Sequence, residues 1–223
     1  MSERIIALVP AHNEARSIAR VVEGARLFLP VLVIDDGSSD DTAEIAIKAG
    51  ASVIRQTPNQ GKGAALRTGF ARAIEEGYDA ILTLDGDGQH DPAEIPLFLQ
   101  VYYRKHADLI IGARQFKQMP FARRLANTLG GWLFSLALGK RVPDNQSGYR
   151  LISRRLVEDL SNCKECGFEF EVEMVVACVR RNYLLDWVHI RTIYADEASH
   201  IKPANHVFNF CRMIWRVGSG RIG

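Results

Sequence analysis

The sequence has no long apolar run and only four cysteines among its 223 residues. No stretch approaches the roughly 20 consecutive apolar residues that cross a bilayer as a helix. The chain opens on a strand pattern rather than a charged and apolar leader, so we also expect no signal peptide. Cys163 and Cys166 have the spacing of half a zinc site, but Cys178 and Cys211 form no second pair. This favours incidental thiols in a reduced, cytosolic protein.

Two glycine-rich fingerprints of nucleotide-binding proteins are also missing. No Gly-x-Gly-x-x-Gly follows the first expected strand, which argues against a dinucleotide-binding dehydrogenase. No Gly-x-x-x-x-Gly-Lys-Ser/Thr occurs, which argues against a P-loop NTPase. The run Gly61-Lys62-Gly63 could form a phosphate loop, but it lacks that spacing and the hydroxyl.

The net charge of +2 conceals two halves of opposite sign. Residues 1–113 hold 11 Lys and Arg against 16 Asp and Glu, whereas residues 114–223 hold 17 against 10. Within residues 114–155, nine basic residues accompany a single acid, Asp144. Such a patch predicts an anionic partner: a phosphate, a nucleic acid or an acidic membrane surface. We expect no nucleic acid, because the basic residues are interleaved with an apolar face rather than a repeated stacking surface.

Short apolar runs alternate with helical patterns over the first half of the chain. The expected strands are residues 5–9, 31–34, 51–54, 80–84 and 108–112. Ser38 or Ser39 is expected to cap the helix after the second strand, and Asp91-Pro92 to start the helix after the fourth. The alternation predicts an α/β fold with a mainly parallel central sheet flanked by helices. The length suits one large domain.

The strand expected at 80–84 stops at two carboxylates, Asp85 and Asp87, separated by one glycine. Side chains two apart on an extended backbone project the same way, so these carboxylates would converge and repel unless a cation lies between them. Mg²⁺ and Mn²⁺ usually take one or two carboxylates plus substrate phosphate oxygens. We therefore interpret the pair as a metal site that holds a diphosphate; the alternative is a polar turn at a strand end.

Polar clusters follow the first three expected strands as well, at Asn13-Glu14, Asp35-Asp36 and residues 59–63. Ligands of parallel α/β sheets bind outside the carboxyl ends of the strands. The four clusters therefore indicate one nucleotide site assembled from separate segments of the chain.

Five segments of the chain resemble the motifs of a known family. They are Val9-Pro-Ala-His-Asn-Glu14, Asp35-Asp-Gly-Ser-Ser-Asp40, Asn59-Gln-Gly-Lys-Gly-Ala64, Asp85-Gly-Asp-Gly-Gln-His-Asp-Pro92 and Ser147-Gly-Tyr-Arg150. In this order they resemble family 2 glycosyltransferases with the GT-A fold, and most of all the polyprenyl- and dolichyl-phosphate sugar transferases. The resemblance covers residues 5–155 and weakens beyond. It implies a catalytic domain over residues 1–200, including an amphipathic segment at 115–142, followed by a basic amphipathic tail at 201–223.

The resemblance assigns the donor side residue by residue. Pro10 and Glu14 match positions that line the nucleoside, and Asp36 matches a carboxylate that reads the base or ribose; the alternative for Asp36 is a local turn. The predicted nucleotide-sugar-binding residues are Pro10, Asn13, Glu14, Asp36, Lys62, Gly63 and Asp85. The predicted metal ligands are Asp85, Asp87 and Gln89. The donor is expected to be a GDP- or UDP-sugar and the cofactor Mg²⁺ or Mn²⁺.

The acceptor side follows in the same way. Arg114, in Gly112-Ala-Arg, matches an arginine near the acceptor phosphate, although the family has serine in the middle position. Asp144 and Arg150 match a segment that closes the active site; the alternative for Arg150 is a surface salt bridge. The predicted catalytic residues are Asp87, Arg114, Asp144 and Arg150. The predicted acceptor-phosphate residues are Arg114, Arg123 and Arg124.

Elementary chemistry distinguishes the possible acceptors. The resemblance implies direct displacement with inversion, and a metal would stabilise the departing diphosphate. A hydroxyl acceptor needs a general base, for which Asp144 is the one candidate in the basic segment. A polyprenyl phosphate is already anionic and needs cations instead, which favours the lipid phosphate. A third hypothesis is a nucleotide-sugar-binding partner of a membrane protein without turnover.

Two segments predict contact with a membrane surface. In residues 121–138 one helical face is apolar, and basic pairs stand at both ends. That face comprises Phe121, Leu125, Leu129, Trp132, Leu133 and Leu136. Residues 207–217 repeat the pattern. We expect a cytoplasmic protein bound peripherally to the cytosolic membrane face. The alternative is that these helices pack on the sheet, across a homodimer or against a membrane-protein partner.

Three features are left without an assigned role. His12 either touches the nucleotide or shapes the turn. The acidic run at residues 169–173 holds either a site carboxylate or a solvated helix start. The loop at residues 199–203 resembles one that folds over the diphosphate.

Overall fold

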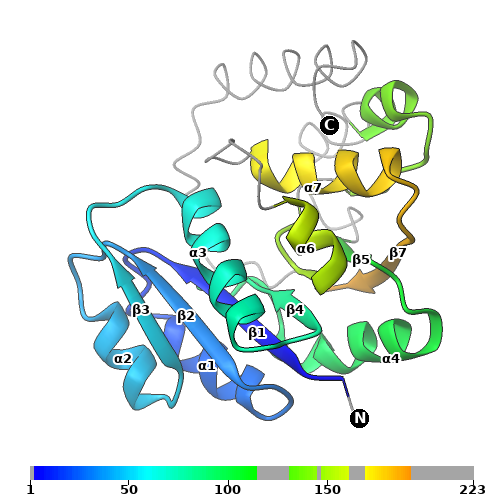
Figure 1. Cartoon of the computed structure of the whole chain (residues 1–223). Helices are drawn as coiled ribbons and strands as arrows, with labels where there is room; N and C mark the ends of the chain where they lie inside the picture. Colours follow the sequence, from blue (N-terminus) through cyan, green and yellow to red (C-terminus); the bar gives the residue numbers. More distant parts are fainter. Residues whose placement is uncertain (1–2, 115–130, 145–146, 161–168, 192–223) are drawn as a thin grey trace.

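The computed structural model describes residues 3–114, 131–144, 147–160 and 169–191. These form one seven-stranded sheet with helices on both faces (Figure 1). The elements are β1 (Ile5–Ala11), α1 (Ile18–Arg26), β2 (Val31–Asp36), α2 (Thr42–Lys48), β3 (Ser52–Gln56), α3 (Lys62–Glu75), β4 (Ala80–Thr83), the 3₁₀ turn η1 (Pro92–Glu94), α4 (Ile95–Lys105), β5 (Leu109–Arg114), β6 (Arg150–Ser153), α6 (Arg154–Leu160), α7 (Glu169–Arg180) and β7 (Leu185–Ile190). The α/β prediction is confirmed, and so are the five expected strands, within a few residues.

The strand order is β3-β2-β1-β4-β6-β5-β7. Neighbouring strands of the described sheet pair in parallel except at β6, which runs antiparallel to both β4 and β5. The sequence analysis missed β6 and β7. β6 is only four residues long and carries Arg150, and the edge strand β7 has a charged residue, Asp186, near its start. Neither strand has the uninterrupted apolar run by which the others were found.

Alternation along β1 divides the core into two layers. Ile6 and Leu8 pack on the side covered by α3, α6 and α7, whereas Ile5 and Val9 pack on the side covered by α1, α2 and α4. This is the period of two expected when a strand is buried on both faces. The sheet is therefore a rigid support, and the loops at the carboxyl ends of β1, β2 and β4 project together from one edge.

The helix starts correct one prediction and confirm another. Neither Ser38 nor Ser39 caps α2; the N-cap is Asp41, because both serines are engaged with the loop after β1. Asp91 does cap the turn that follows the paired aspartates, and its carboxylate accepts a hydrogen bond from the N–H of Ala93. Among the described residues, no helix is both long enough and apolar enough to cross a membrane.

Candidate active site

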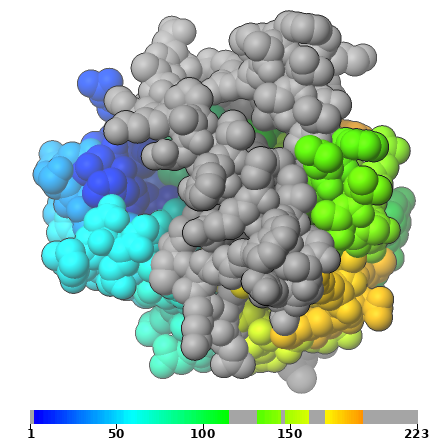
Figure 2. Space-filling view, turned by 90° about the horizontal axis from the view of Figure 1, so that it is seen from above, coloured from blue at the N-terminus to red at the C-terminus, as the bar shows by residue number. Residues whose placement is uncertain are grey.

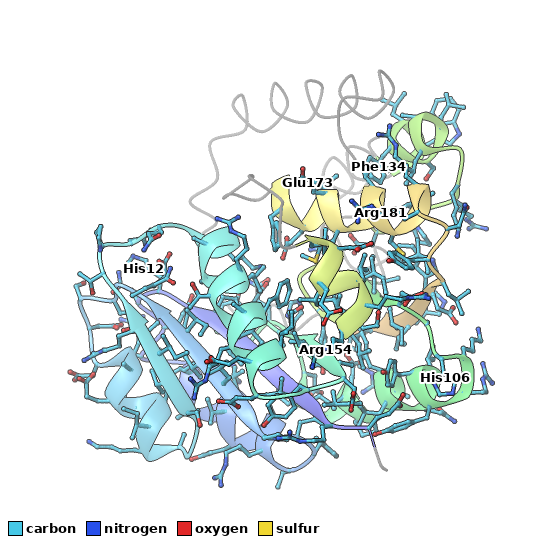
Figure 3. The ribbon with its side chains drawn as sticks, viewed as in Figure 1. His12, His106, Phe134, Arg154, Glu173 and Arg181 are labelled. Atoms are coloured by element: carbon cyan, nitrogen blue, oxygen red, sulfur yellow. The ribbon has the colours of Figure 1, made fainter. Side chains whose placement is uncertain are left out.

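The loops after β1 and β2 are fastened to each other at the carboxyl edge of the sheet, where His12 lies (Figure 3). Asn13 adopts a left-handed backbone with φ of 59°, and its N–H donates to Ser38 Oγ at 2.9 Å. Its side-chain oxygen accepts from the N–H of Ser39 at 2.8 Å. His12 Nδ1 lies 2.9 Å from the carbonyl oxygen of Asp36, to which it must donate, so Nε2 accepts from the Asn13 amide. Both polar side chains therefore shape the turn, and nucleotide binding by Asn13 stays a prediction.

The Asp36 carboxylate holds the loop that leads into α3. It is buried, and one of its oxygens accepts from the N–H of Gln60 and the other from the N–H of Gly61, each at 2.8 Å. Asp35 makes the local turn instead, since its carboxylate accepts from the N–H of Ser38. The alternative considered for Asp36 thus applies to its neighbour, and the predicted contact of Asp36 with base or ribose stays untested.

An ion-pair cluster joins three distant segments at the centre of this edge. Lys62, the first residue of α3, places its Nζ 2.6 Å from Asp85 Oδ1 and 2.9 Å from Glu171 Oε1. Burial disfavours the charge on Asp85, but attraction by Lys62 outweighs it and lowers the pKa of Asp85 to about 2. The same two carboxylates raise the pKa of Lys62 against the opposing effect of burial. Lys62 and Asp85 are therefore both charged at neutral pH.

Asp87 lies near Asp85, as the sequence predicted, and among the described residues no cation forms an ion pair with it. Burial and the negative charge of Asp85 raise the pKa of Asp87, which is the repulsion expected of two converging carboxylates. Gln89 donates its backbone N–H to Asp87 at 2.9 Å, and its side chain is exposed. His90 Nδ1 accepts from the N–H of Asp85 at 3.1 Å, and burial lowers the pKa of His90.

The donor set at Asp85 and Asp87 fits a hard divalent ion, because a cation between them would relieve the repulsion that Asp87 shows. No group of three or more His, Cys, Asp or Glu residues converges as a metal site in the part of the chain that the structure describes. A site of two carboxylates completed by substrate oxygens needs no such group. Pro10 and Glu14 pack close by: a Cβ added to Gly86, between the two aspartates, would lie 3.3 Å from the Pro10 carbonyl oxygen and 3.4 Å from Glu14 Cγ.

The segment before β6 is pressed against the Lys62–Asp85 pair. A Cβ added to Gly148 would lie 2.8 Å from both Asp85 oxygens and from Lys62 Nζ. Arg150 is not a surface residue, because it is fully buried. Its guanidinium donates to the carbonyl oxygens of Ser147, at 2.7 Å, and of Glu171, and burial lowers its pKa. Arg150 therefore holds two segments next to the site: the one that contains Gly148 and the start of α7.

Arg114 and Asp144 form a second centre at the end of β5. Arg114 donates to both oxygens of the buried Asp144 carboxylate, from Nε at 2.7 Å and from Nη2 at 3.1 Å. This two-point geometry is the strong form of an Arg–carboxylate pair. The structure thus brings together two residues that are thirty positions apart and that the sequence analysis had placed in the active site separately.

Some of the residues named in the predictions lie outside the described part of the chain. They are Arg123 and Arg124, the apolar residues of 121–130, Cys163, Cys166, Cys211, the loop 199–203 and the tail 207–217. Cys178 is a buried free thiol. Conversely, Glu171 and Gly148 have roles that the sequence did not assign. The acidic run at 169–173 was a signal for Glu171, but its spacing does not reveal which carboxylate turns inward.

The family model described as Glycosyl transferase family 2 matches residues 6–161. The chain belongs to glycosyltransferase family 2. It is a transferase of the EC 2.4 class with the GT-A fold. An undecaprenyl-phosphate mannosyltransferase of Micrococcus luteus is 30% identical to it over 192 residues, covering 79% of this chain and 78% of the relative.

A UDP-N-acetylglucosamine–dolichyl-phosphate N-acetylglucosaminyltransferase of Methanococcus voltae is 28% identical to this glycosyltransferase over 222 residues, covering 88% of each chain. The fold is similar to that of glucosyl-3-phosphoglycerate synthase from Mycobacterium tuberculosis, solved with Mn²⁺, UDP and glucosyl-3-phosphoglycerate. The TM-score is 0.74 at 22% identity, covering 100% of this chain and 81% of that one. The same protein has also been solved with Mg²⁺ and UDP.

The packing at Gly148 leads to a first test. In the Gly148→Ala variant the new methyl group would push Asp85 and Lys62 apart, so we expect kcat/KM for sugar transfer to fall about ten- to hundredfold. The melting temperature should change little, since the displaced atoms are the ends of flexible side chains. Gly131→Ala is the control, because there the added Cβ meets no atom of the described residues nearer than 3.8 Å. Equal activity in the two variants would show that the close contact at Gly148 has no bearing on catalysis.

Proposed function

We propose that this glycosyltransferase moves a sugar, with inversion, from a nucleoside diphosphate sugar to a polyprenyl phosphate at the cytosolic membrane surface, with Mg²⁺ or Mn²⁺ as cofactor. The observation that carries the choice of acceptor is the pairing of Arg114 with Asp144. Asp144 is the only acid within residues 114–155, and both of its oxygens are bound by a guanidinium. A carboxylate held in this way is a poor general base, whereas a phosphate acceptor requires none.

The donor is supported by the polar loops at the carboxyl edge of the sheet. Asp85 and Asp87 would hold the divalent ion, and Lys62 stands next to them to contact the diphosphate. When bound, the ion would stabilise the negative charge that develops on the leaving diphosphate. The loop held by Asp36, together with the closely packed Pro10 and Glu14, would form a rigid surface for the nucleoside. A rigidly held nucleoside orients the attached sugar, so the site does not have to reorganise during the reaction.

The acceptor is supported by charge and by relatives. Arg114 is the last residue of β5 and stands at the same edge of the sheet as the donor loops. About a fifth of its side chain is exposed, at 21%. The Micrococcus luteus and Methanococcus voltae relatives are named for transfer to undecaprenyl phosphate and dolichyl phosphate. A phosphate held by Arg114 would lie ready for direct attack on the sugar.

Membrane contact is supported by the helical residues 131–138, which reach the surface on one side of the face seen in Figure 2. Trp132 is 61% exposed and Leu136 is 68% exposed, whereas Phe134 between them is buried and fixes the helix to the core. Lys140 and Arg141 follow and are also exposed. An apolar face beside cations is typical of a helix that lies in a membrane interface.

The first test of this function addresses donor and metal. Full-length protein with Mn²⁺ or Mg²⁺, a panel of GDP- and UDP-sugars and a short polyprenyl phosphate should transfer one of the sugars. The Asp87→Asn variant should lower that rate at least a hundredfold while keeping the fold, since it removes an anionic oxygen from the ion. Asp186→Asn is the control and should retain activity, because Asp186 lies on the edge strand β7 and pairs with Lys105. Full activity in excess chelator would rule out the metal role.

The second test separates the two acceptors. In the double variant Arg114→Gln with Asp144→Asn the pair stays neutral and hydrogen-bonded, so no buried charge is left alone. The KM for lipid phosphate should rise about ten- to hundredfold, because charge-assisted bonds to phosphate are lost, while the KM for nucleotide sugar stays within twofold. The control is the double variant Arg155→Gln with Asp108→Asn. These residues form a second two-point pair, at the amino end of β5.

A different outcome would identify Asp144 as a base. In that case kcat of the double variant would fall about 10²- to 10⁴-fold with little change in either KM. The acceptor would then be a hydroxyl.

The third test concerns the membrane. We expect the protein to sediment with anionic liposomes, and this binding to weaken in high salt without vanishing. Basic residues contribute about 1 kcal/mol each and are screened by salt, whereas a large buried apolar side chain contributes roughly 1.5–3 kcal/mol that salt does not screen. Replacing Trp132 and Leu136 with Ser should abolish the salt-resistant part. Ser replacements of Leu27 and Ile47, which are 79% and 58% exposed elsewhere, are the matched control. Unchanged sedimentation of the first variant would contradict a membrane role for this helix.

A further inference from the structure

Lys62 occupies the place of a cation beside Asp85. Its ammonium lies 2.6 Å from Asp85 Oδ1 and 2.9 Å from Glu171 Oε1, so it bridges the loop after β4 and the first turn of α7. The carboxylate that it engages is one of the two proposed to hold the divalent ion. Mg²⁺ binds carboxylate oxygens at 2.0–2.1 Å, roughly where the ammonium now stands.

One side of this oxygen is closed by the segment before β6. Gly148 is packed so tightly on Asp85 and Lys62 that a single added methyl group would lie 2.8 Å from both. Two positive charges on the same carboxylate oxygen would also repel each other. A divalent ion that binds Asp85 Oδ1 therefore has to displace the Lys62 ammonium from it.

Glu171 offers the ammonium a second position. The Glu171 side chain is only 4% exposed, and its Oε2 atom is buried without a hydrogen bond from any described residue. A buried carboxylate oxygen without a partner is unfavourable, so a cation that turned toward it would be stabilised. Arg150 donates to the Glu171 backbone carbonyl, which holds the backbone that carries this carboxylate.

We propose that Lys62 is an exchangeable counter-ion of the metal site. In the metal-free protein its ammonium neutralises Asp85; when a divalent ion binds, Lys62 leaves Asp85, stays with Glu171 and turns a freed N–H toward the donor diphosphate. Glu171 is thus a positioning residue that acts through Lys62. The inference rests on the proposed metal-dependent function and assigns to Glu171 a part in it.

The position of Lys62 in the fold agrees with both states. It is the first residue of the fourteen-residue helix α3, whose free N–H groups and dipole attract an anion such as a diphosphate. When the ion displaces the Lys62 ammonium from Asp85, the ammonium would therefore become available to bind the donor diphosphate. Thermodynamic linkage then requires that a bound nucleoside diphosphate tighten the binding of the ion by the same factor.

Mn²⁺ binding to the full-length protein, followed by electron paramagnetic resonance, tests the exchange directly. Lys62→Met should bind Mn²⁺ alone about tenfold more tightly than wild type, or about 1.4 kcal/mol, because the competing ammonium is gone. The gain in Mn²⁺ affinity that UDP or GDP produces in wild type should shrink about tenfold in the same variant. If Lys62→Met fails to fold, as judged by circular dichroism, Lys62→Gln supplies the measurement.

A double-mutant cycle separates exchange from a general effect of charge. Glu171→Gln should weaken Mn²⁺ binding about tenfold when Lys62 is present, since the ammonium then has no other partner and stays on Asp85. In the Lys62→Met background the same change should have less than a threefold effect. Glu173→Gln, which changes the same charge on the same helix (Figure 3), should stay within twofold in both backgrounds. Additive effects of the Lys62 and Glu171 variants would overturn the exchange.

Two further outcomes have distinct meanings. If Lys62→Met binds Mn²⁺ as wild type does, or more weakly, Lys62 is a fixed tie and the exchange is wrong while the metal-dependent function stands. If wild type binds Mn²⁺ neither alone nor with UDP or GDP, the proposed metal dependence fails and the exchange fails with it.

Discussion

A positive charge held among carboxylates is the interaction on which the site depends. Asp85, Asp87 and Glu171 come from two segments far apart in sequence and lie close to one cation, Lys62. Without a cation their mutual repulsion would force protonation or separation. The rest of the edge is arranged around this requirement: Arg150 fixes the backbone on one side, Gly148 makes room, and Asp36 holds the loop that leads to Lys62.

The sheet separates two tasks. The loops after β1, β2 and β4 are tied to one another by short polar contacts, and in the proposed function they form the donor side. Arg114 and Asp144 lie at the end of β5, on the far side of the inserted strand β6. The proposed donor side is therefore held by several contacts between loops, whereas the proposed acceptor side depends on one pair that joins β5 to a later segment.

The sequence predicted what depends on local pattern. Apolar runs located the five parallel strands, and the spacing of Asp85 and Asp87 predicted a repulsion that the raised pKa of Asp87 shows. It failed where partners are distant. Ser38 and Ser39 looked like helix caps because serine is a good cap, but Asn13, some twenty-five residues earlier, engages both. The inward turn of Glu171 depends on the register of α7 against α3, and nothing in the run 169–173 encodes that register.

The reversed direction of β6 has a consequence for how such a protein can diversify. β5 ends and β6 begins at the same edge of the sheet, so the chain between Arg114 and Ser147 leaves and re-enters at one rim. The Arg114–Asp144 pair closes this excursion near its base. Because both ends of this segment lie at one rim, a change in its length leaves the strand order unchanged. In the function proposed above, this segment is the part of the fold that can vary with the molecule that receives the sugar, while the loops after β1, β2 and β4 serve the one that supplies it.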